Sequence, residues 1–245
     1  MGRVASLWRY PIKAIGREER DVADFVAGQT MPGDRIWAVA HQKGQAADNT
    51  WASCGNFLRA CNVPALHAVA LSTDQSGSVT LTHPDQPDLH VNLHEKPQAL
   101  LDWLAPLVAG TPYTPDALIS TPARGMTDAP FPSVTLCNLS SHKALEQRAG
   151  MDLSIHRWRG NIWLDGLAPW AEFDWEGRTL KLGGAEFRII ERTGRCKATH
   201  ANPETGLRDL DMLGLLGQDG HTDFSMQAEV IKSGPVARGD TLDIL

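Results

Sequence analysis

Apolar runs in this chain are short, and glycine, proline or aspartate interrupts nearly all of them. Residues 6–10, 35–40, 65–71, 78–82 and 89–93 are bounded in this way and predict strands. The runs recur at intervals of roughly 8–15 residues, a spacing typical of a β-barrel or a β-sandwich. The pattern therefore predicts a mainly β protein, of the β-rich α+β class, with a few helices.

The second half of the chain has the same β-rich character. Residues 133–139 predict a strand, and residues 179–182 and 186–190 flank Gly183-Gly184, a two-residue hairpin signal. Residues 226–230 alternate apolar and polar side chains, as a half-buried strand does. These segments predict a second β-rich half.

Helical signals are limited to two segments. Leucines at i, i+3/i+4 and i+7 predict a helix over residues 97–108, which begins with a proline and is followed by a glycine. A shorter helix is expected to end at Arg148, with Ser140 or Ser141 as its N-terminal cap. Residues 110–132 contain five prolines and no clear periodicity, so they predict a connection between two domains.

Composition and charge exclude several classes of protein. The net charge is −6 and the basic residues are scattered, which argues against nucleic acid as the main partner. The longest segments without Asp, Glu, Lys or Arg have 14 residues, and a membrane-spanning helix needs about 20 apolar ones, so no membrane span is expected. The first residues lack the pattern of a secretory signal, so the predicted location is cytoplasmic.

The cysteines are four in number and form no Cys-x-x-Cys pair. In a cytosolic chain this pattern does not predict structural disulfides. Cys54, Cys61 and Cys137 are expected to act as small buried apolar residues. The spacings Cys54–Cys61 and Cys196–His200 lack the paired two-residue spacing of structural zinc sites, so zinc is not expected.

Cys196 is the cysteine with a reactive setting. Arg192, Arg195 and Lys197 lie within four positions of it. Nearby positive charge lowers a thiol pKa and increases the fraction of thiolate, which is both a nucleophile and a soft metal ligand. Cys196 also follows a predicted strand and a glycine, where functional sites are often placed. The alternative is a surface cysteine beside solvated charges.

Further polar candidates lie elsewhere in the chain. In an extended strand Arg157 and Arg159 point to the same side, and two guanidinium groups there suit a phosphate or a carboxylate. Asn161 follows them and can form hydrogen bonds with the edge of a polar ring. The alternative for the two arginines is that they are solvated on an exposed strand. Lys13 and Arg35 are single cations at the ends of predicted strands.

Several common enzyme motifs are absent from the sequence. His221-Thr222-Asp223 resembles part of an acid–base pair, but no Gly-x-Ser-x-Gly element accompanies it, so a hydrolase triad is not supported. The chain has no dinucleotide-binding Gly-x-Gly-x-x-Gly after a strand and no phosphate-binding P-loop. It also lacks an iron–sulfur cysteine set and a haem-attachment motif.

Taken in chain order, these fragments resemble the MOSC superfamily, named for the C-terminal domain of molybdenum cofactor sulfurase. Residues 7–13 and 33–37 are similar to the β-barrel domain associated with that family. Arg192-Thr193-Gly194-Arg195-Cys196, with Pro203-Glu204-Thr205-Gly206 downstream, is the most specific part of the resemblance. Within the family the pattern is most similar to the mitochondrial amidoxime-reducing component and its bacterial counterparts.

The resemblance implies two packed β-barrel-like domains, an N-terminal one over residues 1–120 and a MOSC domain over residues 121–245. It also implies a molybdenum cofactor (molybdopterin) in the cleft, with Cys196 as the thiolate that binds the metal and takes part in catalysis. The residues that would contact the cofactor are Lys13 and Arg35 at its phosphate, Arg159 and Asn161 at its pterin, and Ser140. Asp223 would be a catalytic residue near the open side of the metal.

This chain departs from the family pattern at several positions. Ala14 stands in place of a small hydroxyl residue, Gly160 in place of a proline, and Ser225 in place of a glycine. Residues 45–61 fit the arginine-containing barrel segment of the family poorly. These departures affect the expected substrate pocket more than the expected cofactor site.

The leading hypothesis is a molybdenum-dependent oxidoreductase that reduces N-hydroxylated, or related N- or S-oxygenated, small molecules. Its electrons are expected from a separate donor protein, because the chain carries no nicotinamide, iron–sulfur or haem motif. Two alternatives stay open: a sulfur carrier with a persulfide on Cys196 for metal–sulfur cofactor assembly, and a cofactor-binding carrier without turnover. Lys13 and Arg35 favour cofactor binding, because a sulfur carrier does not need phosphate anchors.

Overall fold

The computed structural model describes residues 2–245, and most of their regular structure is strand. The strands are β1 (Arg3–Arg9), β2 (Glu18–Arg20), β3 (Val22–Phe25), β4 (Trp37–His41), β5 (Ala70–Thr73), β6 (Val79–His83), β7 (Gln86–Val91), β8 (Pro115–Ser120), β9 (Val134–Asn138), β10 (Ile162–Asp165), β11 (Thr179–Leu182), β12 (Ala185–Gly194), β13 (Asp223–Lys232), β14 (Gly234–Ala237) and β15 (Leu242–Ile244). The helices are α1 (Pro97–Val108), α2 (Leu139–Ala149) and α3 (Met212–Gly217), and short 3-10 turns occur elsewhere in the described chain. The mainly β class predicted from the sequence is confirmed.

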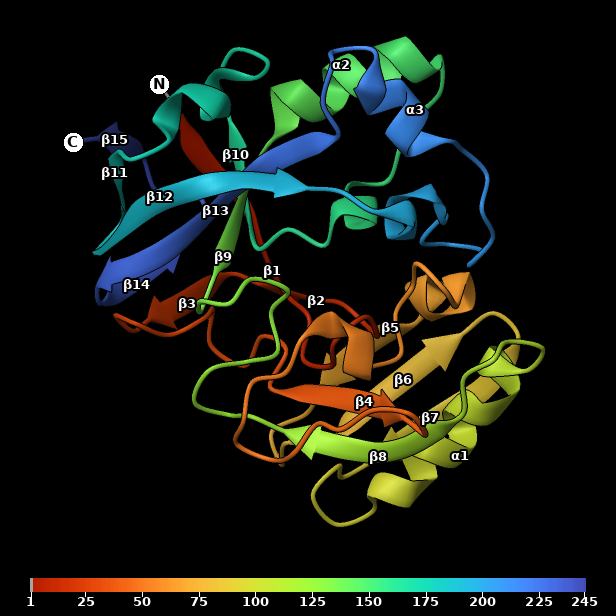
Figure 1. Ribbon diagram of the computed structural model, residues 1–245. Coiled ribbons are helices and arrows are strands. Elements are labelled where there is room, and N and C mark those ends of the chain that lie inside the picture. The colour runs from red at the N-terminus through yellow and green to blue at the C-terminus, as the bar shows by residue number, and fades with distance from the viewer. Residues whose placement is uncertain (1) are drawn as a thin grey trace.

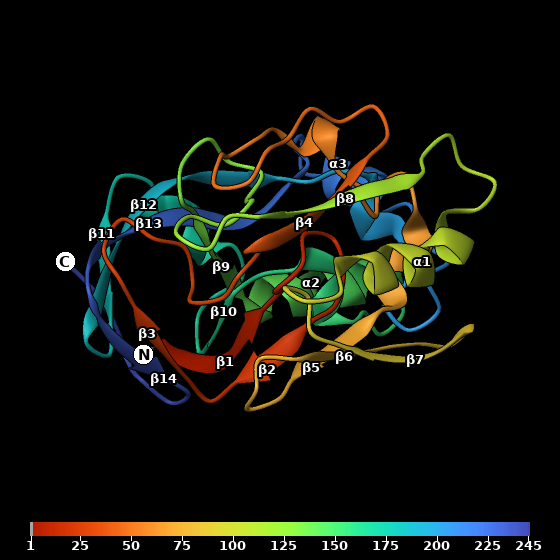
Figure 2. The ribbon, with the colours of Figure 1, turned by 90° about the horizontal axis from the view of Figure 1, so that it is seen from below.

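A curled mixed sheet forms one body of the molecule, in the upper left of Figure 1. Its strand order is β15-β11-β12-β13-β9-β10-β1-β2, and β9 and β10 run parallel to each other. β1 and β2 come from the start of the chain and complete a sheet otherwise built from its second half. β3 pairs with β14 in the same way. The two ends of the chain therefore lie together, as Figure 2 also shows.

The core of this sheet follows the predicted alternation. Met226, Ala228 and Val230 on β13 are buried and pack with Phe187 and Ile189 on β12. Each large apolar side chain buried in this way contributes about 1.5–3 kcal/mol. Gly183-Gly184 joins β11 to β12 at the predicted hairpin, where Leu182 pairs with Ala185.

The second body is smaller and lies in the lower right of Figure 1. β4 pairs with β8, and β5, β6 and β7 form a separate antiparallel sheet. α1 packs on this body through Leu100 and Leu104, which are fully buried on the predicted apolar face. Figure 2 shows β1, β2, β5, β6 and β7 as successive strands along one side of the molecule, so the two bodies share a continuous wall.

One prediction about the smaller body is wrong, and the predicted connection between the domains contains a strand. Residues 65–71 do not form one strand, because Pro64–Ala68 is a 3-10 turn and β5 begins only at Ala70. Pro64 lies at the first position of that turn, where its fixed φ suits a helical start. The proline-rich segment 110–132 contains β8, whose Pro115 is its first residue, a position in a strand that tolerates proline.

α2 lies against the large sheet and is the second predicted helix. Its N-terminal cap is Asn138, not Ser140 or Ser141, and the Asn138 side chain accepts a hydrogen bond of 2.9 Å from the backbone N–H of Ser140. Gly150 ends the helix in the left-handed conformation that glycine adopts without strain. None of the helices between residues 2 and 245 has the length and apolarity that crossing a bilayer requires.

Candidate functional site

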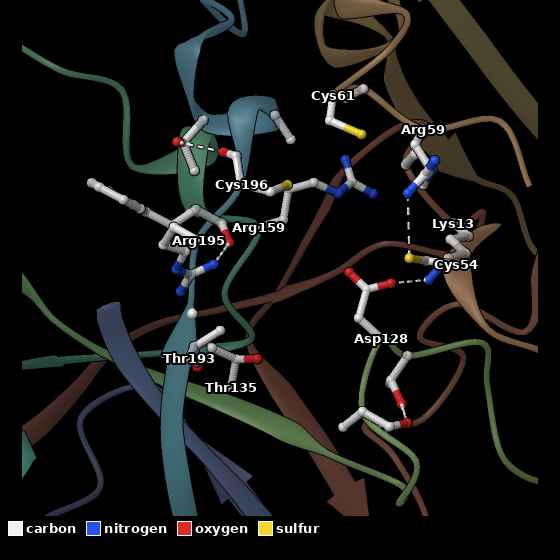
Figure 3. Close-up of a pocket in the computed structure, with 18 of the residues that line it drawn as sticks. Lys13, Cys54, Arg59, Cys61, Asp128, Thr135, Arg159, Thr193, Arg195 and Cys196 are labelled. Atoms are coloured by element: carbon white, nitrogen blue, oxygen red, sulfur yellow. Dashed lines mark hydrogen bonds and ion pairs between the residues drawn. The ribbon is translucent and has the colours of Figure 1, made fainter. Parts of the chain in front are cut away.

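A cavity of about 300 Å³ lies between the two bodies (Figure 3). The smaller body and the loops near β1 and β4 contribute one wall, and the ends of β9 and β12 contribute the other. The charged, hydroxyl and thiol side chains that line it include Lys13, Arg35, Cys54, Arg59, Cys61, Asp128, Thr135, Arg157, Arg159, Thr193, Arg195 and Cys196. The structure thus brings together Lys13, Arg35, Arg159 and Cys196, four of the residues singled out from the sequence.

Cys196 lies where β12 ends and a 3-10 turn, Lys197–His200, begins. Its carbonyl oxygen accepts hydrogen bonds from the backbone N–H and the hydroxyl of Thr199, at 3.1 and 3.0 Å. These contacts hold the backbone, while the thiol is exposed to the cavity and faces Cys61 in Figure 3.

The pKa of Cys196 is lowered from 9.0 to about 6. The main cause is the Cys61 thiol, which can donate a hydrogen bond toward the Cys196 sulfur; the backbone N–H of Ala198 and the charge of Arg195 act in the same direction, and burial opposes them. Arg192, which the sequence singled out, instead stacks 4.2 Å from the centre of the Phe173 ring. The shift favours the Cys196 thiolate, and its main cause is the Cys61 thiol and not the neighbouring charges that the sequence indicated.

Lys13 lies on the opposite wall, in the turn that follows β1. Its backbone N–H donates to the Trp37 carbonyl, and its buried Nζ donates to the Met126 carbonyl at 2.7 Å. Nζ also forms an ion pair with Asp128, whose side chain is exposed. Burial lowers the pKa of Lys13 and the Asp128 carboxylate opposes this shift, so the pair stabilises the charged ammonium group.

Arg35 and Arg159 approach each other beneath the cavity. Both have left-handed backbones, with φ of 52° and 50°. Arg35 pairs with Asp34 and donates to the Arg159 carbonyl at 3.0 Å, and both guanidinium groups lie over the Tyr10 ring, at 5.0 and 4.3 Å. Strained non-glycine backbones cost roughly 1–3 kcal/mol each and cluster at functional sites. Burial, followed by the charge of Arg35, lowers the pKa of Arg159 to about 9, so Arg159 stays charged at neutral pH.

The cavity carries more positive charge than its carboxylates neutralise. Within residues 2–245, Arg59, Arg159 and Arg195 have no carboxylate within ion-pair distance. Arg59 donates to the Cys54 sulfur at 3.5 Å, but its buried Nε has no partner, and neither has the buried Oε1 of Gln227. Buried polar atoms are normally paired, so the Arg59 Nε–H and the excess positive charge indicate an anionic ligand, and the Gln227 oxygen indicates a hydrogen-bond donor on that ligand.

Three of the residues singled out from the sequence lie outside the cavity lining. The fully buried Asn161 side chain accepts from the Thr135 N–H and donates to the Trp8 carbonyl, so its contacts are with the backbone of neighbouring strands. Ser140 lies in the first turn of α2. Asp223 begins β13 and pairs in register with Gly194, two residues before Cys196.

The prediction that Arg157 and Arg159 lie on one strand is wrong. Ile155–Trp158 is a 3-10 turn, and Arg159 follows it in the left-handed conformation. Both side chains line the cavity, but they have separate partners: Arg157 pairs with Asp209 at 2.7 Å, whereas Arg159 donates to the Gly16 carbonyl at 3.1 Å.

Sequence reasoning missed Cys54, Arg59, Cys61 and Asp128. Cys54 and Cys61 were expected to be buried apolar residues, but both are half-buried and line the cavity; Cys137 alone is fully buried. Arg59 lies two positions before Cys61, and a basic residue close in sequence to a cysteine is the same signal that indicated Cys196. That signal was available, whereas nothing local marks Asp128.

The donor set restricts what the cavity can hold. No cluster of three or more His, Cys, Asp or Glu side chains suited to a metal ion occurs among residues 2–245. Cys196 offers one accessible, soft thiolate, and the unpaired guanidinium groups face the same space. These residues therefore fit a metal that has one protein ligand, the Cys196 thiolate, and whose other ligands belong to an anionic organic cofactor.

The sequence profile of the MOSC N-terminal beta barrel domain matches residues 1–105, and that of the MOSC domain matches residues 126–243. Together the two profiles cover most of the chain, which therefore belongs to the MOSC family. A search of the curated proteins finds no match.

Solved structures give weaker similarities. YiiM from Geobacillus stearothermophilus is 19% identical, with a TM-score of 0.35, over 46% of this chain and 53% of that one. YiiM from Escherichia coli is 14% identical, with a TM-score of 0.35, over 46% and 53%. The YuaD protein from Bacillus subtilis is 11% identical, with a TM-score of 0.44, over 100% and 96%. This chain thus spans about half the length of the YiiM proteins, and likenesses this weak do not bear on its activity.

Proposed function

We propose that this protein binds the molybdenum cofactor in the cavity and reduces N-hydroxylated, or related N- or S-oxygenated, small molecules. One observation carries the proposal: an accessible thiolate, Cys196, shares the cavity with guanidinium groups that have no carboxylate partner. Family membership agrees with this choice of cofactor. Molybdenum accepts a soft thiolate ligand, and a phosphate group is suited to arginine and lysine.

In this proposal different residues of the cavity bind different parts of the cofactor. Cys196 is the metal ligand, held by its backbone contacts to Thr199. Lys13 and Arg59 supply positive charge on the wall opposite Cys196, where an anionic tail would bind. Arg159 lies between the two walls, and Arg35 donates to its carbonyl. When bound, the cofactor supplies the two-electron redox chemistry, and the protein supplies position, electrostatics and exclusion of water.

Asp223 has an indirect place in this proposal. Its carboxylate Oδ1 lies 3.7 Å from where a side chain on Gly194 would begin, and it does not line the cavity. Asp223 therefore acts by positioning the end of β12, and through it Cys196.

The electrons come from a separate donor protein in this proposal. The chain carries no nicotinamide, iron–sulfur or haem motif to supply them. Protein loaded with cofactor should reduce an N-hydroxylated substrate when given a reduced viologen dye, but not when given NADH alone. Steady turnover with NADH alone would contradict the need for a donor.

The proposed activity is tested with protein expressed in a host that makes the cofactor. Bound pterin and viologen-driven loss of an N-hydroxylated substrate are measured for the parent protein and for Cys196→Ser. The parent should contain pterin and turn over, and Cys196→Ser should not turn over, because a serine hydroxyl stays protonated and is a harder ligand. Cyanide-labile sulfur on Cys196 without pterin would instead support the sulfur-carrier alternative.

A further inference from the structure

Cys61 and Cys196 come from distant parts of the chain and meet across the cavity. Cys61 follows the Arg59 segment of the smaller body, and Cys196 follows β12 of the large sheet. Both thiols line the cavity, and Figure 3 shows them facing each other from opposite walls. Both cysteines are free thiols, and Cys61 donates a hydrogen bond to the Asn62 side-chain oxygen at 3.6 Å. Cys196 is exposed and Cys61 is half-buried, so a small reagent that enters the cavity meets Cys196 first.

The chain after Cys196 holds these two walls together. Arg208 donates to the Cys61 carbonyl at 2.7 Å. Gly206 has a φ of +68°, and a side chain there would begin 2.8 Å from the Ala65 Cα, so the loop and the Cys61 segment are in close contact. On the other side of that loop, Arg17 donates to the Pro203 carbonyl at 3.2 Å. These contacts fix the backbone of Cys61 beside the loop that begins at Cys196.

The other two cysteines are placed differently. Cys54 also lines the cavity, but its sulfur accepts the 3.5 Å hydrogen bond from Arg59 and lies next to Lys13 in Figure 3. Cys137 is fully buried under Gly160. Cys61 is therefore the thiol placed to react with Cys196.

We propose that Cys61 and Cys196 form a reversible disulfide across the cavity when the protein without cofactor meets a peroxide. The Cys196 sulfur attacks one oxygen of hydrogen peroxide, the O–O bond breaks, and water leaves as Cys196 becomes a sulfenic acid. The Cys61 sulfur then attacks the Cys196 sulfur; the S–S bond forms, the S–O bond breaks, and the hydroxyl leaves as water with the thiol proton. Two thiols are oxidised and one peroxide is reduced.

The disulfide has two consequences for the molecule. It covalently links the two walls of the cavity, and it removes the Cys196 thiolate. It also protects Cys196 from oxidation to the sulfinic acid, which is not reversible by thiols. A dithiol reductant restores both cysteines. The inference rests on the placement of the two thiols and stands whether or not the protein binds molybdenum.

The test uses the full-length protein expressed without cofactor. It is treated with limiting hydrogen peroxide, free thiols are blocked with iodoacetamide, and the intact mass and non-reduced peptides are analysed. We expect a monomer lighter by two hydrogens, a cross-linked peptide pair containing Cys61 and Cys196, and full reversal by dithiothreitol. Cys61→Ser should lose the cross-link and accumulate sulfinic acid on Cys196, whereas Cys54→Ser, the matched control from the same cavity, should behave as the parent.

Three results would overturn the proposal. They are a cross-link from Cys196 to Cys54, cross-links only between two molecules, and sulfinic acid on Cys196 of the parent while Cys61 remains free. The peptide analysis of the parent protein decides among these results without any variant. Failure here leaves the proposed reductase function intact, because pterin content and viologen-driven turnover are measured separately.

Discussion

Single residues near the Cys196 sulfur set its reactivity through space. Arg192 and Arg195 are close to it in the sequence, yet Arg192 stacks on Phe173, and the guanidinium group of Arg195 donates to the carbonyls of Phe224 and Trp158. The Cys61 thiol has the larger influence on the pKa of Cys196. A sequence window around Cys196 therefore identifies the right residue, and the group that controls its pKa lies outside that window.

This arrangement predicts the pH dependence of alkylation of Cys196 in protein without cofactor. Only the thiolate reacts, so the rate should be half-maximal near the pKa of about 6 and should fall below it. Cys61→Ala removes the hydrogen-bond donor and should move the midpoint upward, toward the ordinary value of 9.0. Iodoacetamide labelling followed by mass spectrometry measures the rate. Cys54→Ala is the control, and an unshifted midpoint in Cys61→Ala would refute the assigned cause.

The cationic side chains of the cavity are expected to retain an anionic cofactor. Arg59→Gln and Lys13→Met should each lower the affinity for a phosphate-bearing pterin about tenfold or more, since a charge-assisted hydrogen bond contributes ~1.5–3 kcal/mol. Pterin retained after dialysis measures the loss. Lys181→Met, on the exposed face of β11 outside the cavity, should change nothing. Equal retention by all three variants would place the anion site elsewhere.

At the scale of elements, the sequence correctly predicts the turns and helices that depend on residues close to one another in the chain. The hairpin at Gly183-Gly184 and the helix over residues 97–108 follow from turn residues and apolar periodicity, and both are present. The geometry around Arg157 and Arg159 was not predictable in this way. Their alternating polar pattern suits a strand, but contacts with Asp209 and Gly16, both far away in the chain, stabilise a 3-10 turn there instead.

Gly160, which follows that turn, gives a test of packing next to the cavity. A side chain on Gly160 would begin 2.2 Å from the Cys137 sulfur, so Gly160→Ala should lower the free energy of unfolding by about 1–3 kcal/mol. Adding Cys137→Ala should recover part of the loss, because it removes the clashing sulfur. Urea unfolding measures both effects. Gly217→Ala, where nothing lies within 4 Å, is the control, and an equal cost at both glycines would contradict the packing described.

At the scale of the whole molecule, the class of fold followed from the sequence, and the way the two bodies join did not. Strand spacing indicated a β-rich chain, but no local signal shows that β1 and β2 pair into a sheet built from the second half. The division of the chain at residue 120 stays a prediction. The cavity exists because the two bodies meet, which explains why the sequence indicated Cys196 but missed Cys61, its neighbour on the other wall.

The junction between the bodies contains a buried histidine, His67, and a half-buried one, His156, which predict acid sensitivity. His67 lies within hydrogen-bonding distance of the His156 carbonyl, at 3.1 Å, and burial lowers the pKa of both histidines from 6.5 to about 3. Between those values the unfolded chain binds protons that the folded protein does not, so stability should fall as the pH drops below about 6.5.

Urea unfolding at a series of pH values checks this expectation. His67→Gln has no titrating ring, so its midpoint should fall less steeply with decreasing pH than that of the parent. His90→Gln, at an exposed position, should keep the slope of the parent. If His67→Gln and the parent have the same slope, His67 does not cause the acid sensitivity.

X-ray absorption at the molybdenum edge shows whether Cys196 binds molybdenum in the cavity between the two bodies, as we propose. Protein from a host that makes the cofactor is compared with Cys196→Ser and with Cys54→Ser as the matched control. We expect the parent and Cys54→Ser to have the same sulfur neighbours around molybdenum, and Cys196→Ser to have one sulfur neighbour fewer or to have lost the metal. A parent protein without molybdenum, or an unchanged sulfur shell in Cys196→Ser, would contradict the proposal.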